Sequence, residues 1–215
     1  MSLTRKVREQ LVRALPPEEL LPDAQPAYVH SYVYLFGILT LTSFVMLILS
    51  GTVLAAFGPQ WWHTSTAGHF VNSIHFWSVQ VFFFFMVLHL WAQFCMGAWR
   101  DGRAMTWVTG AVTFVVSIGT AFTGYLSQQN FDAQWIAVQG KDAMNAVGIG
   151  AFFNLLDFGQ MYGFHIILPW LGVLLIGIHV LQVRFRGVVK PYPLPEEEQK
   201  LVSSTGATGS SGQGQ

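Results

Sequence analysis

Long runs of apolar residues dominate the hydropathy pattern of this chain. Four of them, at about 32–57, 71–98, 106–126 and 161–183, are each long enough to cross a bilayer as a helix, which needs about 20 mostly apolar residues. Pro169 lies inside the last run and is expected to kink that helix without ending it. The pattern therefore predicts an all-α membrane protein whose four transmembrane helices pack as a four-helix bundle.

The polar ends and links of the chain set its expected domain boundaries. In residues 1–30, basic side chains alternate with Leu and Val at helical spacing, which predicts an amphipathic helix on the membrane surface. Residues 31–190 form the predicted membrane domain, and the low-complexity tail at 191–215 is expected to be disordered. Between the third and fourth runs, the stretch GIGAFFNLLDFGQ (148–160) is expected to form a short helix at the membrane interface.

Composition supports a membrane protein and excludes several other classes. Hydrophobic residues make up 52% of the chain and charged residues only 10%, against about 25% charged in a soluble domain. The formal net charge is zero, so nothing in the overall charge favours nucleic acid as a partner. The single cysteine, Cys95, excludes an internal disulfide framework and a cysteine-rich metal cluster.

The distribution of Lys and Arg predicts the orientation of the helices. Ten of the eleven basic residues fall on one side of the predicted bundle, and Lys141 alone falls on the other. Because basic residues collect on the cytoplasmic side of membrane proteins, both termini are expected to be cytoplasmic. The second and fourth helices then run in the same direction, from the outer side to the inner side.

Four histidines in the second and fourth runs form the strongest candidate for chemistry. His75 and His89 are fourteen residues apart, and so are His165 and His179. Fourteen residues of helix return to within about 40° of the same face and advance by about 21 Å. Because the two helices run parallel, His75 can meet His165 at one depth and His89 can meet His179 at another.

Histidines inside a membrane are costly unless they are paired or bind a ligand. Two axial imidazoles complete the coordination of a haem iron, so the four side chains fit two six-coordinate haems. The alternatives are histidines buried for structural reasons and a structural zinc site. Zinc is disfavoured, because two histidines at each level leave it short of ligands.

Glycines in the first and third runs repeat the same spacing. Gly37 and Gly51 are fourteen residues apart, as are Gly110 and Gly124. A flat macrocycle between helices needs backbone without Cβ at its closest approach, so each haem could meet one glycine from each helix. The alternative is close packing of membrane helices through small residues.

These histidines and glycines, with TWVTG at 106–110, TGY at 123–125 and HIILP at 165–169, resemble the N-terminal half of cytochrome b. The short form, cytochrome b6, is the most similar. The resemblance implies two b haems, with the low-potential haem held by His75 and His165 on the outer side. The high-potential haem would be held by His89 and His179 on the inner side. It also implies quinone (menaquinone, ubiquinone or plastoquinone) as substrate, and a basic residue near the inner haem at Arg184.

The sequence departs from the family pattern at its outer side. Gln128 and Gln129 stand where the family has Pro-Trp, and Asn72 and Gln160 stand where it has arginines near the haem propionates. Removal of these arginines is expected to lower the potential of the outer haem. Leu35 occupies the place of the cysteine that binds a covalent third haem in b6 proteins, so no c-type haem is expected. The C-terminal half of cytochrome b, which bears a Pro-Glu-Trp-Tyr motif in the family, is expected as a separate subunit.

The resemblance implies transmembrane electron transfer in a quinol-oxidising bc or b6f-like complex, respiratory or photosynthetic, with no catalytic residue assigned to this chain. The implied partners are a Rieske iron–sulfur protein, a c-type cytochrome and a three-helix companion in a multisubunit complex that can be dimeric, together with lipids. One alternative is a dihaem membrane anchor between quinone and a dehydrogenase, hydrogenase or molybdenum enzyme. A second alternative is a proton-coupled transporter with a histidine relay.

Overall fold

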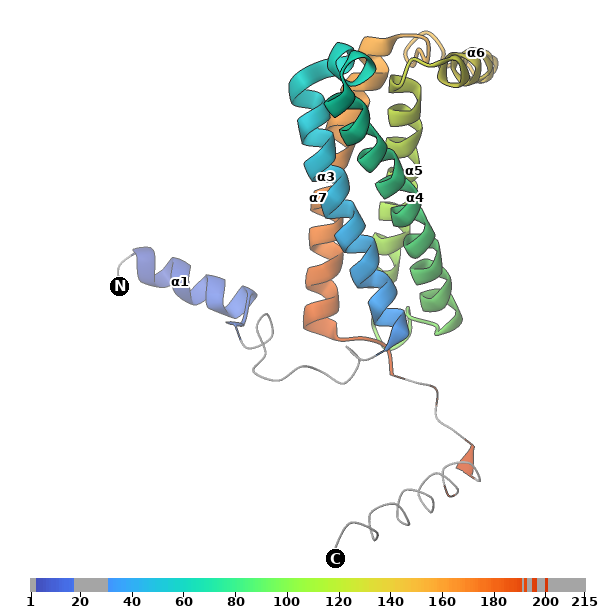
Figure 1. Cartoon of the computed structure of the whole chain (residues 1–215). Coiled ribbons are helices and arrows are strands. Elements are labelled where there is room, and N and C mark those ends of the chain that lie inside the picture. The colour runs from blue at the N-terminus through green and yellow to red at the C-terminus, as the bar shows by residue number, and fades with distance from the viewer. Residues whose placement is uncertain (1–2, 18–30, 191, 193–194, 197–199, 201–215) are drawn as a thin grey trace, which may run out of the picture.

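The computed structural model describes residues 3–17, 31–190, 192, 195–196 and 200, and those residues form helices joined by turns and short irregular segments (Figure 1). The helices are α1 (Leu3–Ala14), α3 (Tyr32–Thr64), α4 (Thr66–Cys95), α5 (Ala104–Ser127), α6 (Phe131–Ala146) and α7 (Phe158–Arg186). Four of them, α3, α4, α5 and α7, are long and apolar enough to cross a membrane. The predicted all-α architecture with four transmembrane helices is confirmed, and so is the helix in the amphipathic N-terminal segment.

Polar side chains cap the starts of three of the four long helices, including α4 and α7. The Ser65 hydroxyl accepts a hydrogen bond from the Gly68 amide at 2.9 Å, so a single residue separates α3 from α4. Asp157 caps α7 in the same way, through the amide of Gln160 at 3.1 Å. Such caps satisfy amides that have no partner inside the helix. The sequence prediction ended the first helix at about residue 57, but the helix continues to Thr64 across a kink at Gly58, whose φ is +78°.

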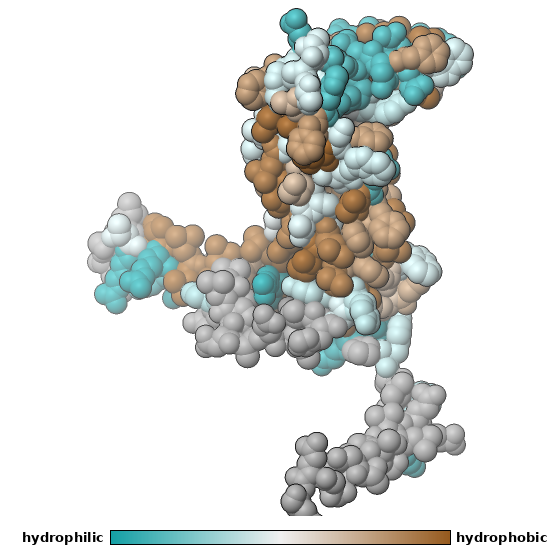
Figure 2. Space-filling model, viewed as in Figure 1, coloured by the Kyte–Doolittle hydropathy of each residue, from teal (hydrophilic) through white to brown (hydrophobic). Residues whose placement is uncertain are grey.

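The four long helices pack as two close pairs. In one pair α3 runs along α4, in the other α5 runs along α7, and α4 meets α5 at few positions. Rings join α3 to α4, with Phe44 and Phe82 centred 5.8 Å apart and Phe36 and Phe85 6.4 Å apart. Figure 2 shows hydrophobic residues along the bundle and hydrophilic ones gathered at the end that carries α6. This end is called the outer end below, and the opposite end the inner end.

A short helix lies at the outer end, but it is not the one that the sequence predicted. Residues 148–157 form turns, residues 158–160 are already the start of α7, and the short helix lies upstream as α6. The Asn130 side chain accepts a hydrogen bond from the Ala133 amide and starts α6. Gly148, at φ +82°, ends it, because a left-handed residue turns the chain out of the helix. The predicted disordered tail lies almost wholly outside the described residues.

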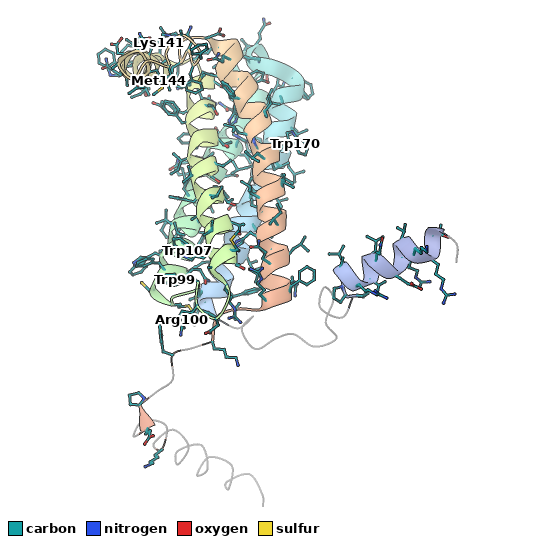
Figure 3. The ribbon with its side chains drawn as sticks, turned by 180° about the vertical axis from the view of Figure 1, so that it is seen from behind. Trp99, Arg100, Trp107, Lys141, Met144 and Trp170 are labelled. Atoms are coloured by element: carbon teal, nitrogen blue, oxygen red, sulfur yellow. The ribbon has the colours of Figure 1, made fainter. Side chains whose placement is uncertain are left out.

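The inner end is closed by residues 187–190, called the inner strap, which follow α7. Arg103 donates a hydrogen bond to the Gly187 carbonyl at 3.2 Å, and Arg100 donates one to the Lys190 carbonyl at 2.9 Å. The Arg100 guanidinium also lies over the Tyr192 ring, 3.7 Å from its centre. Figure 3 places Arg100 at this end of the bundle, beneath Trp107. The strap therefore ties the end of α7 to the link between α4 and α5.

Candidate functional site

The structure brings the two outer histidines together. The rings of His75, on α4, and His165, on α7, have centroids 6.1 Å apart and planes at 89° to each other. A metal–imidazole nitrogen bond of about 2.0 Å, with about 1.1 Å more to the ring centre, would separate two axial rings by about 6.2 Å. The observed spacing of 6.1 Å therefore leaves room for one metal ion between the two imidazoles.

Hydrogen bonds hold these two rings by their Nδ1 atoms. His165 Nδ1 donates to the Thr120 carbonyl at 2.8 Å. His75 Nδ1 donates to the Ser50 hydroxyl oxygen at 2.9 Å, while that hydroxyl donates to the Met46 carbonyl. A proton on Nδ1 leaves Nε2 as the nitrogen with a free lone pair. Contacts of this kind orient histidines that bind metals.

The inner histidines follow the same plan with different partners. His179 Nδ1 donates to the Thr106 carbonyl at 2.9 Å and lies 3.3 Å from the Thr109 hydroxyl oxygen. His89, on α4, interacts electrostatically with His179 across the bundle. Its Nδ1 atom is buried and makes no well-aligned hydrogen bond, and the Val33 backbone interacts with the ring.

Each of the four glycines faces one histidine. A Cβ built on any of them would meet the histidine ring before any other group. The pairs are Gly37 with His89 (3.2 Å to Cε1), Gly51 with His75 (3.1 Å), Gly110 with His179 (3.1 Å), and Gly124 with His165, the closest of all. At Gly124 the added Cβ would overlap the ring, and at the other three glycines the ring would have to shift slightly. Each level has one glycine from α3 and one from α5.

The donor set limits what each level could hold. Among the described residues, no group of three or more His, Cys, Asp or Glu gathers as a metal site. A bare zinc ion would need about four protein ligands. A haem iron carries four ligands in its own macrocycle and needs only the two axial ones. The residues present therefore fit a haem at each level and do not fit a bare ion.

Unpaired donors near the inner level support that fit. Thr106 Oγ1 and Trp107 Nε1 are buried at the inner end of α5 and have no hydrogen-bond partner. Buried donors without partners are rare in folded proteins, because an unmade hydrogen bond costs about 1–3 kcal/mol. Both residues flank the carbonyl that holds His179. A carboxylate of a bound group, such as a haem propionate, would satisfy them.

The departures from the family pattern have clear positions in the structure. Asn72 and Gln128 hydrogen-bond to each other, while Gln129 is exposed at φ +53°. Gln160 accepts a hydrogen bond from the Asn154 amide and thus binds the loop before α7. Arg184 is exposed in the last turn of α7, so its side chain does not lie inside the bundle.

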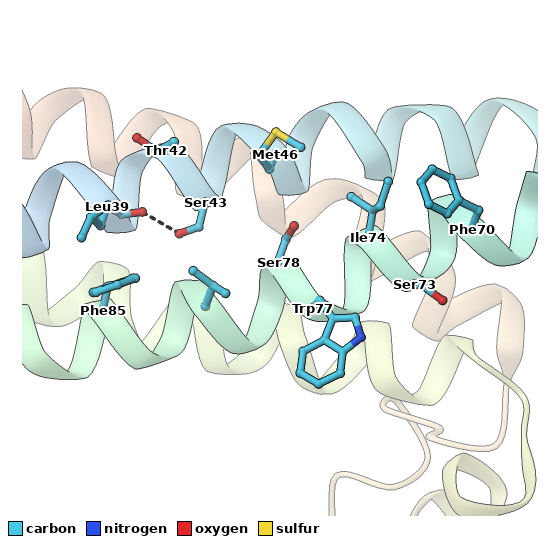
Figure 4. A pocket seen from close by; sticks show the side chains of 11 residues that line it. Leu39, Thr42, Ser43, Met46, Phe70, Ser73, Ile74, Trp77, Ser78 and Phe85 are labelled. Carbon is cyan, nitrogen blue, oxygen red and sulfur yellow. Dashed lines mark hydrogen bonds between the residues drawn. The ribbon is translucent and has the colours of Figure 1, made fainter.

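Two hollows lie beside the histidines without being lined by them. A groove of about 510 Å³ runs between α3 and α4, from Phe70 to Phe85, and its wall is almost wholly apolar (Figure 4). A smaller pocket of about 170 Å³ at the outer end lies between α4 and α5. Ser73 and Trp77 line both hollows.

Comparisons with known proteins agree with this geometry. The sequence model of the family described as cytochrome b (N-terminal)/b6/petB matches residues 80–206. Cytochrome b6 of Heliobacterium modesticaldum is 28% identical over 189 aligned positions, and the match covers 77% of this chain and 89% of that protein. Cytochrome b6 of Synechococcus elongatus is 28% identical over 213 aligned positions, and the match covers 86% of this chain and 99% of that protein.

A longer relative and a solved structure extend the comparison. The cytochrome bc complex cytochrome b subunit of Chlorobaculum thiosulfatiphilum is 28% identical over 188 residues, 77% of this chain and 44% of that protein. A chain of a hyperthermophilic respiratory Complex III shares the fold, with a TM-score of 0.65 and 22% identity, over 85% of this chain and 53% of that one. This chain spans about half the length of these two proteins. Because the family model covers more than half of its residues, the chain belongs to the cytochrome b N-terminal/b6 family.

Proposed function

We propose that this chain carries electrons across a membrane through two b haems, one between His75 and His165 and one between His89 and His179. The observation that supports this most directly is the outer ring pair, whose centroids lie 6.1 Å apart. When bound, haem iron supplies one-electron exchange between its ferric and ferrous forms. The chain supplies the axial imidazoles, fixes their tautomers through Nδ1 and excludes water by packing.

The proposal places the two sites at different depths. Each pair of ligands on one helix is fourteen residues apart, which corresponds to about 21 Å along the helix axis. The outer haem is proposed to have the lower potential, because no cationic side chain stands at Asn72 or Gln160 to stabilise extra negative charge. Both termini are proposed to lie in the cytoplasm, which places the Arg100 and Arg103 loop there as well.

Within a complex, the chain would act as the cytochrome b subunit of a quinol-oxidising assembly, with quinone as its substrate. Its relatives are named as cytochrome b6 and as a bc complex subunit. The expected partners are a Rieske protein, a c-type cytochrome and a three-helix companion subunit. The exposed apolar faces of α3, α4, α5 and α7 leave room for such contacts as well as for lipid.

Spectroscopy of the purified full chain tests the proposal. The wild-type chain should contain two haems per chain and titrate in two redox waves. His75→Ala and His165→Ala should each remove the lower-potential wave, and His89→Ala and His179→Ala the higher one. A colourless wild-type protein would contradict the assignment. So would the loss of the same haem in variants of the outer and of the inner histidines.

A second function is favoured by the outer end of the molecule. Gln128 stands where the resemblance places the Pro-Trp that helps build the family's outer quinol site, and it hydrogen-bonds to Asn72, which stands at the place of a propionate arginine. A dihaem anchor that passes electrons between quinone and another redox enzyme would not need that site. Quinol–cytochrome c reduction by the intact complex separates the two functions, since only the bc-type complex would catalyse it.

A further inference from the structure

Two carboxamide side chains join the two helix pairs at the outer end of the bundle. Asn72 Nδ2 donates to Gln128 Oε1 at 3.1 Å, and Gln128 Nε2 donates back to Asn72 Oδ1 at 3.1 Å. We call this reciprocal pair the amide clamp. The two residues are 56 positions apart in sequence, on α4 and just after α5, and both are half-buried.

The amide clamp sits directly beside the outer histidine level. Asn72 precedes His75 by three residues, so it lies one turn from that ring on the same helix. Gln128 follows Gly124 by four residues, and Gly124 is the position against which His165 packs. The clamp therefore links the helix that carries one outer ligand to the helix that holds the other ligand in place.

Packing alone does little at this junction. Contacts within each pair of helices are extensive, but α4 and α5 meet at few positions. A small pocket of about 170 Å³ with a mixed polar and apolar lining also opens there, lined by both clamp residues and by Tyr125. The two hydrogen bonds therefore add to the few contacts between α4 and α5 at this depth, while Trp62 on α3 and Tyr162 on α7 join the pairs on the other side.

The two amide side chains also satisfy each other's hydrogen-bonding groups. Either amide alone would leave a partly buried group with an unmade hydrogen bond, which is unfavourable. Together each satisfies one donor and one acceptor of the other, without adding charge. The inner level has a different tie, in which Arg100 and Arg103 bind the carbonyls of the inner strap.

We propose that the amide clamp is a positioning device that holds α4 against α5, so that His75 and His165 face each other at ligating distance with crossed planes. Its neutral side chains fix the geometry of the outer site without supplying a positive charge to it. This inference rests on the proposed function, because the positioned rings are taken to be haem ligands.

Release of haem from the purified full chain tests the role of the clamp. Asn72→Leu and Gln128→Leu should each speed release of the outer haem by about tenfold, because a hydrogen-bonded pair is lost and one amide is left unpaired. The inner haem should be released at the wild-type rate. The double variant should be no worse than the worse single variant, because no unpaired amide remains.

A spectroscopic reading separates positioning from general loss of stability. In the ferric protein, the largest g value of the low-spin outer haem is high when the imidazole planes are crossed. It should fall in both leucine variants and recover in the exchanged pair Asn72→Gln with Gln128→Asn. Gln139→Leu removes an exposed amide on α6 and serves as the matched control, with no expected change in either reading.

Each outcome decides the matter. Equal effects on both haems, an unchanged g value in the leucine variants, or a fully additive double variant would overturn the positioning role. If a leucine variant fails to fold, the variant with exchanged residues is tested in its place. If that variant does not keep the wild-type rate of haem release and the wild-type g value, the positioning role is overturned. A wild-type chain without haem would instead refute the proposed function, so the two failures are distinguishable.

Discussion

Substitution of Gly124 by Ala is the sharpest test of how the outer site is built. A Cβ at this position would overlap the His165 ring, with Nδ1 at 2.7 Å and Nε2 at 2.9 Å and one ring carbon closer still. Carbon atoms do not approach a ring this closely, so the imidazole must move. The movement would also break the 2.8 Å hydrogen bond from His165 Nδ1 to the Thr120 carbonyl.

The expected magnitude follows from these two losses. Overpacking of a tight site costs about 1–3 kcal/mol, and loss of a hydrogen bond adds about 1 kcal/mol. A total of about 3 kcal/mol corresponds to roughly a hundredfold weaker binding of the outer haem. Redox titration and haem-release kinetics of the full chain should show the lower-potential wave reduced and the higher one intact.

The same helix offers a graded set of controls. Gly119 has nothing within 4 Å of a built Cβ, so Gly119→Ala should leave both haems in place. It should also favour the helix slightly, since Ala is a better helix former than Gly by about 1 kcal/mol. Gly110→Ala would place a Cβ 3.1 Å from His179 Cε1 and should weaken the inner haem, but less severely. Wild-type binding of both haems by Gly124→Ala would refute the reasoning.

Three further predictions concern the surroundings of the site. Ser50→Ala removes the hydroxyl acceptor of His75 Nδ1, which lowers the basicity of the ring, and leaves the interaction with the Leu47 backbone. Outer-haem affinity should fall by up to about tenfold, and the potential of that haem should rise in a redox titration. Arg103→Gln loses charged hydrogen bonds to the end of α7 and should cost about 2 kcal/mol of stability, seen as a lower melting temperature of the solubilised chain. In intact cells, an impermeant maleimide should label the cysteine of Lys141→Cys at the outer end and should leave Cys95, at the inner end, unmodified. Labelling of Cys95 but not of the new cysteine would show that the outer end faces the cytoplasm and would refute the proposed orientation.

The sequence predicted the long helices well because bilayer length and apolar composition are local properties. It placed the end of the first helix too early, since Gly58 and Pro59 suggested a loop there, whereas the chain bends at Gly58 and continues as helix. The helix α6 was missed because its sequence is too polar to stand out by hydropathy. Its signals were local ones, the cap at Asn130 and the left-handed turn at Gly148.

The structure brings His75 and His165 together, as the sequence predicted, but the sequence could not reveal what holds the rings. Two of the Nδ1 partners are backbone carbonyls, those of Thr106 and Thr120, and a carbonyl leaves no trace in residue identity. Ser50 was hidden among other hydroxyl residues of an apolar helix. The departures at Asn72 and Gln128 were visible singly, but their reciprocal hydrogen bonds needed the packing of two distant segments.

One period accounts for the two levels of the site. Histidines, glycines and the carbonyls that hold His165 and His179 all repeat after fourteen residues, and Thr106 and Thr120 each precede their glycine by four. In a helix, the carbonyl four residues earlier lies one turn below, so a missing Cβ opens the path from the ring to that carbonyl. The glycine therefore admits the ring and gives its Nδ1 atom a partner at the same time. Because the period makes the two levels alike, differences between them must come from residues outside it, the amide clamp at the outer end and the arginine-bound strap at the inner end.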